Sequence, residues 1–279
     1  MSQERENNNE KELGKMTVDE ANNNAHLHHH QQQQHHLLEP NQNPYHVSLT
    51  YNPTVPKAGQ PTLITIDVTK MQTNERVKEF DFLHEKLMHV IIVSEDLSYF
   101  SHIHPTFDVK EGKFTIYHLF PENSNYKIWV DFKPKNGNQT LVTFKLDNLI
   151  DTVHKPRHIT KERQYTKQID ETHQVKLYIP KEIKSNEPVN LTFAILDRNS
   201  NPITDLTPLM GAGGHCVIVS SDLQEYLHVH PSEEVSSNWK GGPEISFSAI
   251  FPHPGLYKAW GQFQHHNMII TAGFVLESM

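Results

Sequence analysis

The sequence contains a single cysteine, Cys216, so it cannot form a disulfide within the chain. It also lacks any run of 18 or more apolar residues, the length that a membrane-spanning helix requires. The first fifteen residues are polar and include no apolar stretch of the kind found in a secretory signal peptide. These absences are compatible with a reducing compartment. We therefore expect a cytoplasmic protein with no membrane span.

Basic residues are not in excess. The formal net charge is -8, from 25 basic and 33 acidic residues, which gives no reason to expect nucleic acid as a partner. The sequence contains no phosphate-binding loop, dinucleotide fingerprint, G-x-S-x-G or H-E-x-x-H motif, so we expect a protein that is not an enzyme. The compositional anomaly is histidine, at 21 of 279 residues.

The N-terminal segment, residues 1–45, consists mainly of Asn, Gln, Glu and His. It has too few apolar side chains to offset the entropy of ordering it, so we predict a disordered tail. Six histidines between His26 and His36 are interspersed with glutamines. Two interpretations stay open: a loose metal-collecting tract, or low-complexity drift with no function.

From His46 onward the pattern changes to period two. Val47, Leu49 and Tyr51 alternate with polar residues, and similar short runs separated by turn residues follow. About seven short strands in each hundred residues, without a convincing amphipathic helix, predict an all-β chain of immunoglobulin-like β-sandwiches. The predicted organisation is a disordered His/Gln/Asn-rich tail over 1–45, a first sandwich over 46–147, a charged linker over 148–172 and a second sandwich over 173–279.

The two predicted sandwiches are copies of one another. The matching segments are Met88–Ser94 with Gly214–Ser220, His102–Pro105 with His228–Pro231, and Tyr126–Trp129 with Tyr257–Trp260. Because order, spacing and residue type agree together, the sequence predicts a tandem repeat.

The repeat also separates the histidines into two kinds. Three recur at equivalent positions: His89, His102 and His104 in the first copy, and His215, His228 and His230 in the second. Histidines that lack a histidine counterpart are His84, His118, His253, His265 and His266. The recurring set is the candidate site.

Strand geometry brings each set of three together. Residues two apart share a face of a strand, so His102 and His104 project together. A tight antiparallel hairpin places His89 opposite His104 or one diagonal step away, whereas a slip of one residue would send it to the other face. Cys216, next to His215, should point away from its set. Three neutral imidazoles are a familiar ligand set for zinc or copper ions.

The segments Leu87–Leu97 and Phe100–Pro105 resemble bacterial YtkA-like and FixH-like β-sandwich domains, and more loosely CopC-like copper-resistance proteins. Phe251–Lys258 is similar to the F-P-x-P-G-x-Y ending of those domains. The resemblance implies an immunoglobulin-like fold and a role in handling copper or another heavy metal. Such domains are usually exported or membrane-tethered, and this sequence departs from them because it shows no export signal.

Two functions are compatible with these observations. The first is a metal-binding protein that buffers, carries or senses copper or zinc, with the metal ion as ligand and a metal-receiving protein as a candidate partner. The alternative is a non-catalytic structural or protein-interaction module whose histidines are packing residues. Asp96 and Asp222 also recur, but their position suits the hairpin turn. Tyr126, Trp129 and their counterparts suit packing.

Overall fold

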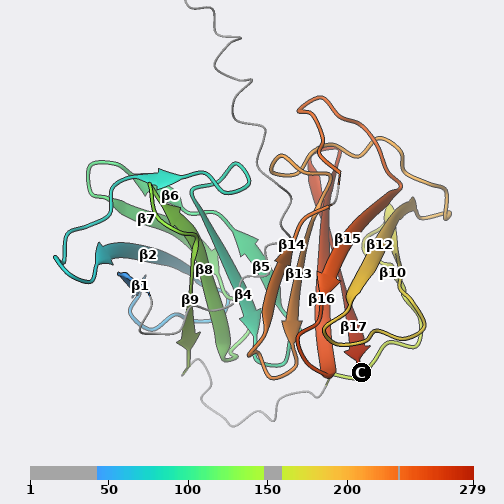
Figure 1. Cartoon of the computed structure of the whole chain (residues 1–279), viewed down its shortest axis with the longest axis horizontal. Helices are drawn as coiled ribbons and strands as arrows, with labels where there is room; N and C mark the ends of the chain where they lie inside the picture. The colour runs from blue at the N-terminus through green and yellow to red at the C-terminus, as the bar shows by residue number, and fades with distance from the viewer. Residues whose placement is uncertain (1–42, 148–158, 232) are drawn as a thin grey trace, which may run out of the picture. The chain divides into compact units, whose positions relative to one another are not determined.

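The computed structural model describes residues 43–147, 159–231 and 233–279, which belong to one compact unit, Gln32–Met279. The predicted tail up to residue 42 and the linker residues 148–158 lie outside the described residues. Every regular element in the described ranges is a β-strand, so the all-β prediction is confirmed (Figure 1). Within the same ranges, no helix is long and apolar enough to cross a membrane.

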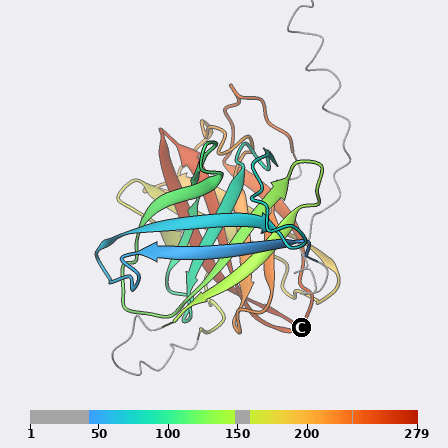
Figure 2. The ribbon, with the colours of Figure 1, turned by 90° about the vertical axis from the view of Figure 1, so that its left-hand side faces the viewer.

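The first sandwich contains nine strands in two antiparallel sheets. One sheet has the order β1-β2-β7-β6; the other has the order β3-β8-β4-β5, with β9 also paired to β8. Figure 2 shows β1 and β2 side by side, crossing in front of the strands of the second sheet. The strands are β1 (Tyr45–Asn52), β2 (Pro61–Lys70), β3 (Phe80–Asp81), β4 (Met88–Ser94), β5 (Phe100–Ile103), β6 (Thr106–Asp108), β7 (Lys113–Leu119), β8 (Tyr126–Pro134) and β9 (Thr140–Leu146).

The second sandwich contains eight strands with the same plan. Its sheets have the orders β10-β11-β12-β15 and β14-β13-β16-β17. The strands are β10 (Thr166–Gln168), β11 (His173–Tyr178), β12 (Pro188–Asp197), β13 (His215–Ser220), β14 (Tyr226–Val229), β15 (Glu244–Ile250), β16 (Gly255–His265) and β17 (Met268–Ser278).

Two details differ from the prediction. The short strands β3, β6 and β10 raise the strand counts above seven, because elements of two or three residues are too short to show a period. The second sandwich also begins before residue 173, since β10 lies within the predicted linker and pairs with β11. Lys167 holds β10 in place by donating hydrogen bonds to Glu162 and to the carbonyl of Gly273.

Strands β4 and β13 are buried on both faces, and this determines where the histidines lie. Val90 and Ile92 of β4 face the core of the first sandwich. The alternate residues Ile91 and Val93 face the second sandwich instead. Together with Leu97 of the β4–β5 turn and residues of β8, β9, β13, β14 and β16, they form a third apolar cluster. This interface cluster comprises Ile91, Val93, Leu97, Trp129, Leu141, Val217, Val219, Tyr226 and Trp260.

Contacts across the interface cluster occur in reciprocal pairs. Trp129 stacks on Tyr226, with ring centroids 5.3 Å apart, and their repeat counterparts Trp260 and Phe100 stack at 4.8 Å. Lys127 donates a hydrogen bond to the carbonyl of Leu223, and its counterpart Lys258 donates one to the carbonyl of Leu97. Such reciprocity is the signature of a local twofold axis between the two copies. The sheets that carry β4–β5 and β13–β14 therefore pack on each other (Figure 1).

We expect Trp129→Ala to lower the free energy of unfolding by about 3–5 kcal/mol, because the fully buried indole fills the interface cluster and the cavity it leaves cannot collapse fully. Urea denaturation followed by circular dichroism measures the change. Tyr117→Ala is the matched control, since Tyr117 is 72% exposed and should change stability by no more than about 0.5 kcal/mol. Equal effects of the two substitutions would contradict the assigned packing.

Candidate metal centre

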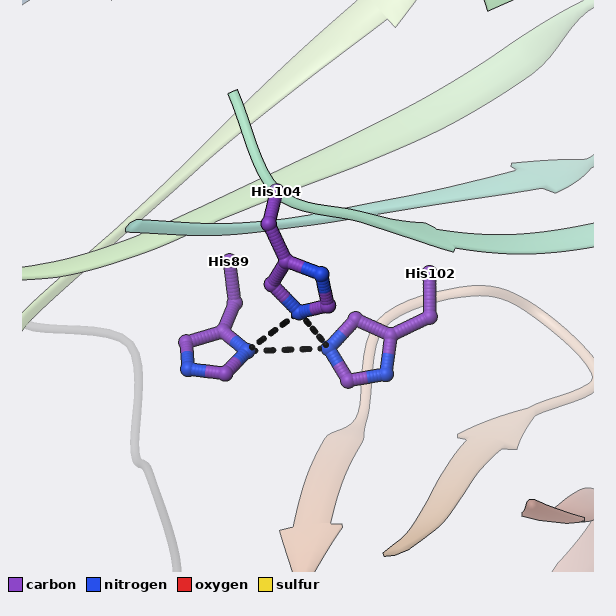
Figure 3. A group of neighbouring side chains, drawn as sticks. All are labelled: His89, His102 and His104. Carbon is purple, nitrogen blue, oxygen red and sulfur yellow. Dashed lines mark hydrogen bonds between the residues drawn. The ribbon is translucent and has the colours of Figure 1, made fainter. Parts of the chain in front are cut away.

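The first histidine triad forms on the β4–β5 hairpin. The register pairs Val90 with Ile103, so His89 and His104 come opposite each other where the ladder ends. The Nδ1 atom of His89 lies 2.9 Å from Nε2 of His102 and 3.1 Å from Nε2 of His104, and the last two atoms are 3.2 Å apart. Figure 3 shows the three rings pointing at one another with these nitrogens innermost. Of the two placements that residue parity allowed, the one with His89 directly opposite His104 is observed.

The second triad repeats this arrangement on β13–β14. Cys216 pairs with Val229, which brings His215 and His230 opposite each other in the same way. One ring nitrogen from each of His215, His228 and His230 lies within 4.8 Å of the others. The structure thus brings all six predicted residues together as two groups of three. Cys216 points into the core of the second sandwich, away from the triad, as predicted.

A backbone carbonyl fixes the first ring of each triad. His89 Nε2 lies 2.8 Å from the carbonyl oxygen of Leu83, and His215 Nε2 lies 2.9 Å from that of Leu209. A carbonyl can only accept, so in a neutral ring Nε2 carries the proton and Nδ1 presents its lone pair to the triad. Metal-binding histidines are typically oriented in this way, by donating their other ring N–H to a carbonyl or carboxylate.

The second ring of the first triad has the same polarity. His102 Nδ1 lies 2.9 Å from Oε1 of Gln262, whose amide nitrogen donates to Thr271. An amide oxygen accepts, so neutral His102 carries its proton on Nδ1 and turns a lone pair toward that of His89. Two lone pairs 2.9 Å apart repel each other. A proton on His104, or a cation between the rings, is required to make this contact favourable.

In the second triad, two of the ring nitrogens that face the other rings are buried without hydrogen bonds. Among the described residues, Nδ1 of His215 and Nε2 of His228 have no hydrogen-bond partner. These atoms are the repeat counterparts of the facing nitrogens of His89 and His102. A buried polar atom without a partner costs about 1–3 kcal/mol. Both triads therefore place imidazole lone pairs where a donated proton or a cation is needed to satisfy them.

The two triads are neighbours across the local twofold axis. The ring centroids of His102 and His228 are 5.4 Å apart, those of His89 and His228 5.5 Å, and those of His102 and His215 6.0 Å. The first two distances fall within the range between rings of one triad, 4.6 to 5.7 Å, and the third is slightly longer. Gln262 of the second sandwich also orients His102 of the first. The six imidazoles form one cluster to which both copies contribute.

Burial keeps these rings uncharged. Desolvation lowers the pKa of His104 and of His215 to about 3, with a smaller contribution from neighbouring histidines. The pKa values of His102 and His228 lie well below the usual range for the same reasons, and that of His89 is also lowered. Neutral imidazole is the form that binds a metal.

His84 was not among the predicted ligands, because no histidine recurs at its counterpart. The residue lies in a two-residue turn, Leu83–Lys86, and its ring stacks on that of His230 with centroids 3.5 Å apart. The matching turn, Leu209–Ala212, carries Met210 at this position. Both turns present the carbonyl that orients the first ring of a triad. The two turns can be aligned in the sequence, but Met210 stands at the position of His84, so the recurrence of histidines did not identify this residue.

A third group was also missed, because recurrence was the criterion and its members belong to one copy. Asp205, His265 and His266 bring ligand atoms within 4.8 Å of one another in the second sandwich. By contrast, the turn role expected for Asp96 is confirmed: its carboxylate accepts hydrogen bonds from the hydroxyl of Ser94 and the backbone of Ser98.

Fold and repeat define a class, the two-domain β-sandwich protein. More specifically, the chain belongs to the family described as "Domain of unknown function (DUF8832)", whose model matches residues 40–148 and again 167–279. No curated protein matches the chain. The predicted resemblance to YtkA-like and FixH-like domains stays a prediction.

The chain is distantly similar to several solved structures. These include a red sea bream transglutaminase (9% identity, TM-score 0.24), covering 85% of this chain and 31% of that one. Another is the Yersinia pseudotuberculosis adhesin InvE (8% identity, TM-score 0.25), with 82% of this chain and 58% of that one covered. A third is the D00-D0 domain of intimin (13% identity, TM-score 0.25), with 82% of this chain and 98% of that one covered. The chain thus spans less than two thirds of the first two. At such TM-scores the likenesses say nothing of this chain's function.

We expect the metal-free protein to lose stability as the pH falls below about 6.5, the reference pKa of histidine. The folded-state pKa of His104 and His215 is about 3, so between these values the unfolded chain binds protons that the folded chain does not. Unfolding is then favoured by acid. Melting temperatures measured with a chelator present, from about pH 7.5 to about pH 4.5, test this. His104→Gln should make the decline shallower, and a melting temperature that does not change with pH would contradict the assigned burial.

Proposed function

We propose that the protein binds copper or zinc ions in its two histidine triads and serves as a buffer, carrier or sensor of the metal. The observation that supports this best is the set of inward-facing lone pairs. Hydrogen bonds to Leu83 and Gln262 fix the outer nitrogens of His89 and His102, so that the inner ones turn toward each other at 2.9 Å. Copper(II) and zinc(II) both accept imidazole ligands readily.

The dimensions of the first triad suit such an ion. Its three inner nitrogens are 2.9, 3.1 and 3.2 Å apart. His89, His102 and His104 would hold the ion through these nitrogens, because separations near 3 Å are compatible with bonds of about 2.0–2.1 Å to all three. Three neutral imidazoles form a ligand set of the kind that zinc and copper ions accept.

The two sandwiches carry different side chains at one turn position near the triads, and this difference is relevant to which metal ion would bind. His84 stacks on the second triad, whereas Met210 occupies the corresponding turn position of the other copy. An imidazole suits zinc or copper, and a thioether suits copper(I). Both metals therefore belong in the test.

Metal stoichiometry tests the triads. We expect His102→Ala/His104→Ala to lose about one equivalent of Cu(II) or Zn(II) in calorimetry, and His228→Ala/His230→Ala to lose another, because each pair supplies two of three ligands. All proteins should be full-length with the six tail histidines replaced by Gln, so that the tail does not contribute: His26, His28, His29, His30, His35 and His36. Metal should also raise the melting temperature of the parent protein, since it binds the folded hairpins.

The matched control is His46→Ala/His253→Ala, which removes two exposed histidines outside the triads and should keep the full stoichiometry. Circular dichroism establishes that each variant is folded. If a triad variant keeps all its metal equivalents while its melting temperature collapses, the histidines are packing residues, and the structural or protein-interaction module becomes the better interpretation.

Because the two triads are adjacent, we also predict that ions bound to them would interact magnetically. The centroids of His102 and His228 are 5.4 Å apart. An ion bound to either ring lies about 3 Å from its centroid, so two bound ions would be no more than about 11 Å apart. We expect the Cu(II)-loaded protein to give a dipole-broadened electron paramagnetic resonance spectrum with a half-field transition. His228→Ala/His230→Ala should restore the spectrum of an isolated ion, and a spectrum without coupling at full loading would show that the triads do not bind as a pair.

A further inference from the structure

A second kind of histidine cluster lies at the β16–β17 hairpin of the second sandwich, and it contains none of the triad residues. Strand β16 ends at His265, which pairs with Met268, and the turn between them has positive φ at His266 and Asn267. This two-residue turn stacks the rings of His265 and His266, with centroids 3.8 Å apart. Their Nε2 atoms lie 3.0 and 3.2 Å from the two carboxylate oxygens of Asp205.

A chain of hydrogen bonds, from Asp170 at the surface through His173, determines which nitrogen of His265 is protonated. The carboxylate of Asp170 accepts hydrogen bonds from Thr172 and from the backbone and Nδ1 of His173. His173 therefore carries its proton on Nδ1 and accepts, through Nε2, the Nδ1 proton of His265 at 2.9 Å. Neutral His265 is left with a lone pair on Nε2.

That lone pair points at a negative group. His265 Nε2 is 3.0 Å from Oδ1 of Asp205, so two acceptors face each other unless a cation or an additional proton lies between them. His265 and His173 are both buried. A metal-binding ring is typically fixed by donating its other N–H to a hydrogen-bond acceptor, which for His265 is Nε2 of His173. Asp205 and His266 are half or more exposed, which leaves the opposite side open to solvent.

We infer that Asp205, His265 and His266 form a third metal site, for a divalent transition ion of the zinc class, with His173 and Asp170 as positioning residues. Two imidazole nitrogens and one carboxylate oxygen match the donors that such ions prefer. The first sandwich provides an internal comparison, because its matching turn carries Pro134 and Lys135 in place of His265 and His266. This site is specific to the second copy and does not depend on the triads.

Zinc titration of the full-length protein with glutamine at its six tail histidines tests the inference. Asp205→Asn and His266→Ala should each remove about one zinc equivalent and leave the melting temperature of the metal-free protein unchanged, because both side chains are largely exposed. His253→Ala is the matched control, since His253 is an exposed histidine beside a carboxylate, that of Glu225, without a second imidazole; it should lose nothing.

The ring nitrogens of His265 provide a second measurement that does not depend on counting ions. In nitrogen-15 NMR spectra, Nε2 of His265 should change from a protonated to a metal-bound shift when zinc is added, while Nδ1 stays protonated. If Nε2 stays protonated at saturating zinc and both variants keep every equivalent, the cluster is an ion pair held by a proton and the inference is wrong. Because the triad variants leave this cluster intact, failure of the triads to bind metal would be seen separately.

Discussion

Packing of one sandwich on the other is the constraint on which the rest of the structure depends. The interface cluster buries the outer face of β4 and β13, and that face also carries His89 and His215. Without the second copy this face of each sheet would be exposed to water, and the desolvation that lowers the pKa of His89 and His215 would be smaller. When the second copy packs against them, the imidazoles lose contact with water, and their hydrogen-bond partners determine which ring nitrogen carries the proton. The fold thus creates six largely desolvated, inward-facing rings from residues that are unremarkable in an isolated hairpin.

Desolvation and pairing favour one protonation state. Burial lowers the pKa values of His102 and His228 most, and repulsion between charged imidazoles at such close range lowers them further. Both effects keep the rings neutral. Neutral rings whose outer nitrogens donate to Leu83, Leu209 and Gln262 must turn lone pairs inward. Purely structural histidines would be expected to alternate donors and acceptors. Repetition of the opposite arrangement in two copies is the strongest physical reason to prefer a cation as their shared partner.

Residue parity and internal repetition were enough to predict the fold class and both triads. The alternation of buried residues gave the sandwiches, and His102 and His104, two apart, had to share a face. The twofold axis was beyond that reasoning, because the same repeat could be arranged by translation, and only long-range contacts such as Trp129 with Tyr226 distinguish the two. His265 and His266 were missed for another reason: their partners, Asp205 and His173, lie 60 and 92 residues away in the chain.

Differences between the copies show where the two halves have different electrostatics. Gln262 pairs with His215 across β13 and β16, and at the equivalent place beside His89 the first copy carries Asp131. Burial raises the pKa of Asp131 to about 7, and the amide of Gln139 donates to both its oxygens. Two divalent ions bound close together repel each other strongly in a desolvated site. When ionised, the carboxylate of Asp131 would offset part of that charge, whereas the amide of Gln262 would not. The two copies thus repeat the ligand geometry of the triads but not their electrostatic environment, and under the proposed function this difference would favour filling one triad before the other.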